Sequence, residues 1–305
     1  MKISVIGAGN VGATLAMRIV ESNMADVVLV DILDGLAKGK AVDISDAAPI
    51  LGHEKNIEGT TDISKIKDSD VVVMTAGLAR KPGMSRDDLI GKNAAIIGAV
   101  AQAIRINCPK AIVVVVTNPL DVMTYHMIKI TGFSKNKVLG MAGTLDSSRL
   151  INILAEQLNV ERKSIETIVL ACHGDTMVPV LSATKVNGRP LYEVLPKEKI
   201  EEVINKTKFR GSEIVEYLKT GSAYYSTSAG VLQILNAIKN DTDQILPVSA
   251  YLDGEYEIKE CCLGVPVKIG RNGINEIVEI TLTAEERAAL QESAQKTIEM
   301  IRVLS

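Results

Sequence analysis

The segment CHGD, Cys172 to Asp175, holds a histidine that could transfer protons. His173 follows the apolar run IETIVLA and precedes a glycine, and the chain has only three histidines. The ordinary pKa of histidine is close to neutral pH, so an imidazole at a strand end can act as a general base or acid in a cleft. A lone histidine at such a position is nevertheless more often structural than catalytic. The segment by itself leaves both interpretations open.

The segment LDSSR, Leu145 to Arg149, pairs an acid with an arginine. Asp146 and Arg149 lie three residues apart in a stretch of helical periodicity, so both belong to one face of the expected helix. This spacing alone is more typical of a surface ion pair, which contributes roughly a few tenths of a kcal/mol to stability. Without further context, the surface ion pair is the favoured interpretation.

The segment ARKPGMSRDDL, Ala79 to Leu89, concentrates positive charge. Arg80, Lys81 and Arg86 fall within seven residues, before two aspartates begin the next expected helix. The whole chain has 34 Lys plus Arg against 37 Asp plus Glu, a net charge of −3. Such a charge offers no long-range attraction for nucleic acid or an anionic membrane, so we expect neither as a partner. The three cations are a local feature, either a solvated loop or a site for a small anion.

The segment GAGNVG, Gly7 to Gly12, has the G-x-G-x-x-G spacing that binds the pyrophosphate of a dinucleotide at a helix N-terminus. Asp31 ends the next strand nineteen residues later, close to the roughly 20 expected for the acid that binds the adenosine ribose. This acid would repel a 2′-phosphate, and neither of the next two residues is an arginine, so the expected cofactor is NAD rather than NADP. The predicted contacts are Gly7, Ala8, Gly9, Asn10, Val11, Gly12 and Asp31.

Asn118 lies in VTNPLD, Val116 to Asp121, where the fourth expected strand ends. Ligands of open α/β sheets bind outside the carboxyl ends of the strands, so Asn118 is placed to contact a cofactor or a substrate. A simple turn or a helix N-cap is an equally good interpretation of this asparagine alone.

The first half of the chain, residues 1–142, alternates apolar strand runs with stretches of helical periodicity. The strand runs are KISVIG, DVVLVD, DVVVMTAG, AIVVVVTN and KVLGMA. The expected helices are 11–23, 35–50, 88–107 and 119–131. This alternation indicates an α/β fold with a doubly wound parallel sheet, a Rossmann domain that binds NAD.

The second half, residues 143–305, does not continue this regular alternation of strands and helices. Its pattern indicates an α+β catalytic domain. It contains one strand, IETIVLAC, and hairpin-like sequence at 246–280. Thr283 and Glu286 predict a capping box at the start of the last helix. The expected helices are 145–158, 197–219, 222–239 and one from 284 onward.

Composition limits the class of protein further. The 305 residues suffice for two domains of roughly 100–200 residues each, with a cleft between them. No apolar stretch approaches the roughly 20 residues of a membrane span, and the N-terminus shows no export signal. We therefore expect a soluble, cytoplasmic protein with reduced cysteines and no metal site, because the cysteines lack metal-ligand spacing. The four cysteines are Cys108, Cys172, Cys261 and Cys262.

The ordered set GAGNVG, Asp31, ARKPGMSR, VTNP, LDSSR and HGD closely resembles the lactate/malate dehydrogenase superfamily, in particular the malate dehydrogenases of lactate-dehydrogenase-like type. The match extends over essentially the whole chain. It implies NAD as the cofactor and reversible hydride transfer between (S)-malate and NAD. It also implies a small dicarboxylate substrate, a homodimer or homotetramer, and work in the tricarboxylic acid cycle.

The resemblance assigns roles to single residues. His173 corresponds to the proton acceptor, and Asp146 to the carboxylate that fixes the imidazole. Arg149 corresponds to the arginine that binds the substrate C1 carboxylate, for which a planar guanidinium suits a bidentate pair. Arg86 corresponds to the mobile-loop arginine that polarises the reacting carbonyl, and Asn118 to a substrate-contacting asparagine. The implied cofactor contacts beyond the glycine loop are Asn93, Val116, Thr117 and Asn118.

The same resemblance makes Arg80 the residue that selects the substrate. This position is typically glutamine in the lactate enzymes and arginine in the malate enzymes. A second substrate carboxylate would form a charge-assisted hydrogen bond worth roughly 1.5–3 kcal/mol, whereas pyruvate would leave Arg80 unpaired. The chain departs from the family at CHGDTMVP, commonly GHGDSMVP, and at YYSTSAG, where YYAPA is common. The second departure bears on fine specificity.

Other interpretations remain open. A dehydrogenase for lactate or another 2-hydroxy acid would fit glutamine at position 80 better than the arginine present. A non-catalytic NAD-sensing Rossmann protein could lose His173, Arg149 or Arg86, and this chain keeps all three. An NAD-dependent glycosidase also begins with a Rossmann pattern, but the sequence shows no matching set of metal ligands.

Overall fold

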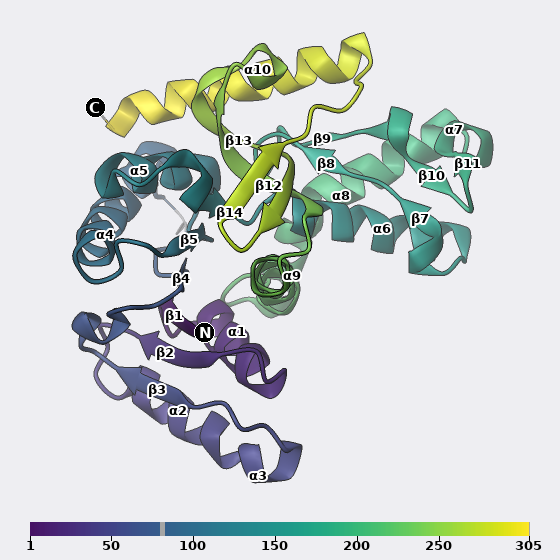
Figure 1. Ribbon diagram of the computed structural model, residues 1–305. Helices are drawn as coiled ribbons and strands as arrows, with labels where there is room; N and C mark the ends of the chain where they lie inside the picture. Colours follow the sequence, from purple (N-terminus) through teal and green to yellow (C-terminus); the bar gives the residue numbers. More distant parts are fainter. Residues whose placement is uncertain (80–82, 305) are drawn as a thin grey trace.

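The computed structural model describes residues 1–79 and 83–304, and its centre is one nine-stranded sheet with the order β14-β13-β12-β6-β5-β4-β1-β2-β3. Strands β1 to β6 are parallel (Figure 1). Their order is that of the doubly wound Rossmann sheet, so the fold predicted for the first half is confirmed. The six strands are β1 (Lys2–Ile6), β2 (Asp26–Val30), β3 (Ile57–Thr60), β4 (Val71–Met74), β5 (Ile112–Val115) and β6 (Val138–Gly140).

Helices cover both faces of the parallel sheet because the side chains of each strand alternate between two cores. In β4, Val71 and Val73 pack with α1 and α9, whereas Val72 and Met74 pack with α4 and α5. These pairs of helices lie on opposite sides of the sheet (Figure 1). The helices are α1 (Asn10–Glu21), α2 (Leu36–Asp46), α3 (Ala48–Leu51), α4 (Arg86–Asn107), α5 (Leu120–Thr131), α6 (Gly143–Leu158), α7 (Leu191–Val194), α8 (Lys197–Leu218), α9 (Tyr225–Asn240) and α10 (Ala284–Ile301).

The second half of the chain extends the same sheet. β12 (Gln244–Asp253) pairs antiparallel with β6 at Ser249 and Gly140, and β13 (Lys259–Gly270) and β14 (Gly273–Ile277) follow outward. The hairpin-like sequence predicted these strands but not their partner. A parallel sheet that ended at β6 would leave unpaired backbone groups along an edge, and β12 covers that edge.

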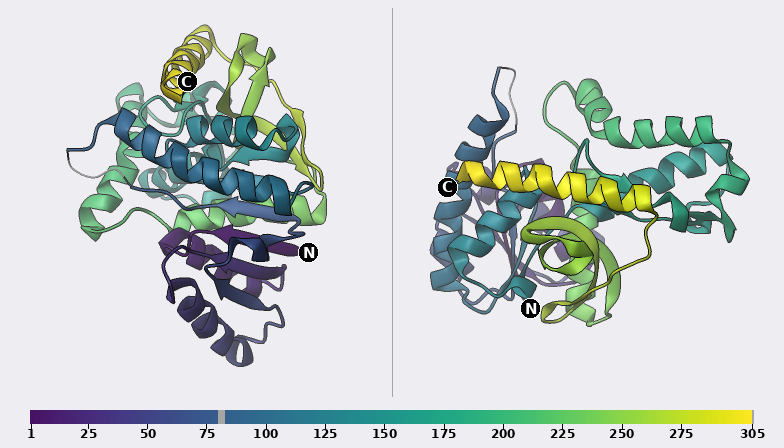
Figure 2. Two further views of the ribbon diagram at one scale, coloured as in Figure 1. Left: turned by 90° about the vertical axis from the view of Figure 1, so that its left-hand side faces the viewer. Right: turned by 90° about the horizontal axis from the view of Figure 1, so that it is seen from above.

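A smaller lobe forms around α6 and α8. The single strand expected at IETIVLAC is two short strands, β7 (Ile165–Glu166) and β8 (Val169–Leu170), in two small sheets. β7 pairs with β10 (Lys185–Val186), which also pairs with β11 (Arg189–Pro190), and β8 pairs with β9 (Val178–Pro179). The last helix, α10, begins with the predicted capping box. It runs along β13 and α5, so it joins the two halves of the molecule (Figure 2).

The region between β2 and β4 differs from the expectation. β3 was not predicted, because its four residues IEGT include a single large apolar side chain and none of the four is buried. It is nevertheless held close to α2, where a Cβ on Gly59 would lie 2.1 Å from the Ala37 carbonyl oxygen. The single helix expected at 35–50 is two helices, α2 and α3, and Pro49 lies in the first turn of the second.

Helix α4 is, among the described residues, the one helix long and apolar enough to cross a membrane by length and composition. By this measure, our expectation that no such segment exists is wrong. One face of α4 packs into the core beside α5 through Ile90, Ile97 and Ile104. This packing buries 33% of the apolar window of the helix.

Candidate active site

A cleft of about 460 Å³ lies at the carboxyl ends of β1, β4 and β5, opposite α6, α8 and the start of α9. A hollow of about 180 Å³ at the glycine loop adjoins it, and both are lined by Val11, Thr75, Gly221 and Ser222. A larger depression of about 1120 Å³, at the amino ends of the strands, contains none of the predicted site residues. The predicted residues that line the cleft are Val11, Val116, Thr117, Asn118, Arg149 and His173.

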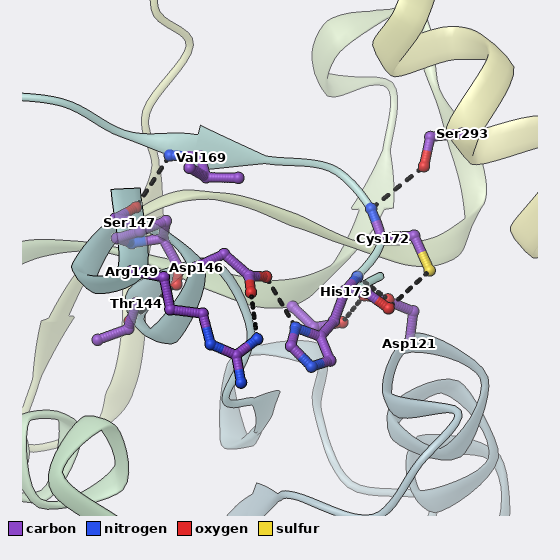
Figure 3. Close-up of polar contacts among 11 residues, drawn as sticks. Asp121, Thr144, Asp146, Ser147, Arg149, Val169, Cys172, His173 and Ser293 are labelled. Carbon is purple, nitrogen blue, oxygen red and sulfur yellow. Dashed lines mark hydrogen bonds and ion pairs between the residues drawn. The ribbon is translucent and has the colours of Figure 1, made fainter. Parts of the chain in front are cut away.

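His173 and Asp146 form a close pair on one wall of the cleft. Nδ1 of His173 lies 2.7 Å from Oδ2 of Asp146, which is 1% exposed (Figure 3). A carboxylate can only accept, so this contact places the proton on Nδ1 and leaves Nε2 available. The negative charge of Asp146 raises the pKa of His173 above its ordinary value, while burial acts in the opposite direction. The pair is therefore a tautomerically fixed imidazole with increased basicity.

Arg149 lies beside the same carboxylate. Its Nη1 is 3.4 Å from Oδ1 of Asp146, the partner expected from the i,i+3 spacing. The contact is buried, not at the surface, and burial lowers the pKa of Arg149. Nε of Arg149 is buried without a hydrogen-bond partner among the described residues. A buried guanidinium with an unsatisfied N–H at a cleft can bind an anion such as a carboxylate.

Asn93 supports the floor of the cleft from behind and is fully buried. Its Nδ2 donates to the carbonyl oxygens of Asn118 at 2.6 Å and Leu78 at 3.1 Å, and its Oδ1 accepts from the Leu78 N–H at 2.8 Å. Asn118 itself lines the cleft with an exposed side chain. The Asn93 side chain thus holds the ends of two strands together, and the cofactor contact predicted for it stays a prediction.

The glycine loop presents open backbone at the N-terminus of α1. A Cβ on Gly7 would lie 2.7 Å from the Ala76 nitrogen, and a Cβ on Gly12 would lie 1.9 Å from the Gly7 carbonyl oxygen. A Cβ on Gly9 would meet nothing within 4 Å. The helix has no side-chain N-cap hydrogen bond and no acid in its first turn. Its free N–H groups and dipole therefore favour an anion in the adjoining hollow.

Two family models together match almost the whole chain. The model described as lactate/malate dehydrogenase, NAD binding domain, matches residues 1–140. The model described as lactate/malate dehydrogenase, alpha/beta C-terminal domain, matches residues 143–302. The chain belongs to the lactate/malate dehydrogenase family.

Individual family members are similar over nearly their full length. A malate dehydrogenase of Rhodopirellula baltica is 46% identical over 305 residues, covering 99% of this chain and 97% of that protein. The structure of the Salinibacter ruber malate dehydrogenase has a TM-score of 0.95 and 42% identity, covering 100% of this chain and 97% of that one. The Cryptosporidium parvum lactate dehydrogenase complexed with lactic acid and nicotinamide adenine dinucleotide has a TM-score of 0.96 and 38% identity, covering 99% and 97%. Backbone similarity alone therefore does not separate the two enzyme types.

The NAD site expected of a lactate/malate dehydrogenase fits the residues around the glycine loop. The Asp31 carboxylate accepts hydrogen bonds from the Ala8 N–H at 2.7 Å and the Leu33 N–H at 2.9 Å. Each carboxylate oxygen has a further lone pair, so Asp31 can still accept from ribose hydroxyls. Lys40 donates to the Ala8 carbonyl oxygen at 2.7 Å and so braces the loop. Among the residues that the structure describes, no group of three His, Cys, Asp or Glu could hold a metal ion.

Of the two arginines assigned to the family's mobile loop, the structure describes only Arg86. Arg80 lies outside the described residues. Arg86 is the first residue of α4, is exposed, and is not part of the cleft lining. Burial and the neighbouring Asp121 charge raise the pKa of the Cys172 thiol, and Arg86 opposes that rise only weakly. The roles of both arginines stay predictions.

Two residues of the site were not singled out from the sequence. Asp121 is 1% exposed, and its carboxylate contacts the backbone of His173. Thr227 lines the cleft, and its hydroxyl donates to the Ala223 carbonyl oxygen at 3.0 Å. The available signal for Asp121 was an acid in the first turn of the helix after Asn118. The signal for Thr227 was the departure of YYSTSAG from the family pattern.

Proposed function

We propose that this chain is an NAD-dependent malate dehydrogenase that interconverts (S)-malate plus NAD with oxaloacetate plus NADH. The observation that carries the proposal is the His173–Asp146 pair beside buried Arg149, in the cleft that adjoins the glycine loop. Relatives named malate dehydrogenase, 46% and 48% identical over at least 95% of their length, support the choice of substrate.

In this proposal, each residue of the cleft has a defined task. NAD, held by the glycine loop and Asp31, supplies the hydride acceptor. Nε2 of His173 takes the proton of the malate hydroxyl as the carbon–hydrogen bond breaks, and Asp146 stabilises the imidazolium that forms. In the reverse direction, the imidazolium returns this proton to the oxygen of the former carbonyl. Arg149 binds the C1 carboxylate and so fixes the hydroxyl near His173.

Substrate choice depends on the second carboxylate of malate and oxaloacetate. Arg80 is the cation that we expect to bind it, and Arg86 the cation that polarises the carbonyl. Steady-state rates with NADH and oxaloacetate against NADH and pyruvate test the proposal. Clear preference for pyruvate would refute it. Arg80→Gln should lose oxaloacetate reduction by orders of magnitude while NADH binding is unchanged, and Lys81→Gln serves as the matched loop control.

Experiments can distinguish two alternative functions from the proposed one. A lactate or other 2-hydroxy-acid dehydrogenase is compatible with the fold, since a lactate dehydrogenase is among the similar structures. Arginine at position 80 and the names of the relatives favour the malate enzyme. A non-catalytic NAD sensor would bind NADH without turnover. His173→Ala should abolish most turnover and keep NADH affinity, whereas unchanged turnover would overturn the catalytic interpretation.

We also propose that the chain acts as a homodimer or homotetramer in the cytoplasm, within the tricarboxylic acid cycle. Large apolar side chains exposed on α3 and α8 support self-association: Ile50 is 84%, Phe209 59% and Tyr217 76% exposed. Light scattering coupled to size-exclusion chromatography tests this, and a monomer at micromolar concentration would refute it.

A further inference from the structure

The buried carboxylate of Asp121 has no task in the reaction described above, yet it contacts the catalytic segment. Asp121 lies in the first turn of α5. Its Oδ1 accepts from Oγ of Ser249 on β12 at 2.6 Å, and its Oδ2 accepts from the His173 N–H at 3.3 Å. Figure 3 shows Asp121 on the opposite side of His173 from Asp146. The catalytic histidine thus lies between two buried acids, one bound to its ring and one to its backbone.

The groups around the Asp121 side chain are hydrogen-bond donors. The Cys172 thiol donates to the His173 carbonyl oxygen at 3.8 Å, and its proximity also lowers the pKa of Asp121. A protonated carboxyl group would need an acceptor for its own proton, so the hydrogen bonds from Ser249 and His173 favour the ionised form. Burial acts against them and raises the pKa of Asp121, because the ionised group loses its hydration. The fold therefore keeps a desolvated acid here and surrounds it with compensating donors.

We propose that Asp121 is a positioning residue that fixes the backbone of His173 from the side opposite Asp146. The inference rests on the proposed function, in which His173 moves the proton. Asp146 orients the imidazole ring, but the position of the ring also depends on where the backbone of His173 is held. The neighbouring Cys172 N–H is held by Oγ of Ser293 on α10 at 3.2 Å, so two elements tether this segment.

The electrostatic surroundings of both groups are defined by few residues. Asp146 and Arg149 on α6 act on His173 with opposite signs, and Asp121 on α5 adds a second negative charge. On the α4 side, Arg86 acts on Cys172. The groups from β13 that face Asp121 are uncharged thiols, because burial raises the pKa of Cys261 to about 12 and that of Cys262 well above its ordinary value. Removal of the Asp121 charge should therefore be felt mainly at His173.

A proton NMR titration of the histidine rings tests the inference without any need for turnover. The chain has only three histidines, and His173→Asn identifies the His173 signals. In Asp121→Asn, the side chain keeps one acceptor oxygen but loses its negative charge. The new amide group is a donor and faces the donors that surrounded the carboxylate. We expect the pKa of His173 to fall by about one unit. We also expect kcat for oxaloacetate reduction to fall by on the order of 10- to 100-fold, with its alkaline limb at lower pH.

Thr124→Val is the matched control on the same helix. Thr124 is fully buried, carries no charge, and its hydroxyl donates to the Leu120 carbonyl oxygen at 2.8 Å within the helix. This variant should lower the melting temperature without changing the pKa of His173 or the pH profile. If Asp121→Asn does not fold, Ser249→Ala takes its place. Loss of that donor favours protonated Asp121, so the pKa of His173 should shift in the same direction by a smaller amount.

The outcomes separate this inference from the proposed function. If Asp121→Asn loses only thermal stability while the His173 pKa and kcat match wild type, Asp121 is merely structural and the inference is overturned. An unchanged His173 pKa in Ser249→Ala has the same consequence. If instead the wild-type chain does not reduce oxaloacetate, the proposed function fails, and the NMR comparison still decides whether Asp121 acts on His173.

Discussion

The glycine loop and the His173 cluster lie at the same cleft but are built in opposite ways. The loop is contiguous in sequence and works through backbone, since added side chains at Gly7 and Gly12 would collide with neighbouring backbone. The cluster is assembled from side chains on α5, α6, β12 and the segment after β8, and works through charge. The loop therefore determines whether a dinucleotide fits, and the cluster determines the chemistry in the proposed reaction.

The largest expected effect is in the cluster, at the acid that holds the imidazole. Asp146→Asn should lower kcat by about 10²- to 10⁴-fold, because the imidazolium loses its counter-charge and the tautomer is no longer fixed. NADH affinity, measured by fluorescence titration, should stay at the wild-type value. Loss of NADH binding in this variant would contradict the view that the glycine loop and the His173 cluster act independently.

The same variant makes a pH prediction with a definite sign. Reduction of oxaloacetate needs protonated His173, and the Asp146 charge raises the pKa of His173. The alkaline limb of kcat/KM for reduction should therefore move to lower pH in Asp146→Asn. The raised pKa also stabilises the fold below the ordinary histidine pKa, and this contribution is lost as pH rises through the folded-state pKa. An alkaline limb that does not move would show that another group titrates there.

The next effect concerns substrate binding by the cluster. Arg149→Gln should raise KM for oxaloacetate by about 10- to 150-fold, the equivalent of losing a charged hydrogen bond. Arg210→Gln is the control, because Arg210 does not line the cleft and pairs with Glu213 at 3.0 Å. It should leave KM near the wild-type value. Equal changes in the two variants would show general electrostatics and not a specific carboxylate site.

The sequence predicted the part of the site that is formed by neighbouring residues of the chain. It did not predict the part that is formed by tertiary contacts between distant residues. GAGNVG with Asp31 predicted the loop directly, because turn, helix start and strand end are close in the chain. In contrast, LDSSR and CHGD alone favoured structural roles, since the Asp146–His173 contact joins positions 27 residues apart. Ser249 and Asp121 are 128 residues apart. Only the resemblance to a family identified the first pair, and nothing in the sequence identified the second.

The fold class was predicted correctly, but some strand pairings were missed for the same physical reason. A hairpin was expected at 246–280, but the pairing of β12 with β6 covers an edge of the parallel sheet, which no local pattern encodes. β3 was missed because an edge strand next to solvent needs no apolar alternation. The smaller lobe was expected as helices and one strand, and its division into two small sheets follows from packing between distant segments.

A smaller effect is expected in the loop, and it acts on the fold. Gly12→Ala should destabilise the protein by about 1–3 kcal/mol, because its Cβ would overlap the Gly7 carbonyl oxygen. Gly9→Ala is the control within the loop. It has open space, so stability should stay within about 0.5 kcal/mol while the methyl group in the hollow weakens NADH binding. Chemical denaturation and NADH titration measure the two effects, and equal losses of stability would contradict the geometry.

The smallest effect tests whether local motifs affect the cleft at a distance. Thr283 accepts a hydrogen bond from the Glu286 N–H at 3.2 Å and begins α10. Thr283→Ala should cost about 1 kcal/mol of unfolding free energy. Ser293, which holds the Cys172 N–H, lies ten residues further along the helix, or about 15 Å at 1.5 Å per residue. Fraying of the first turn should not reach it, so kcat and the His173 pKa should be unchanged. A fall in kcat would mean that the first turn of α10 and the segment around His173 unfold together. The His173 cluster would then depend on the whole length of that helix.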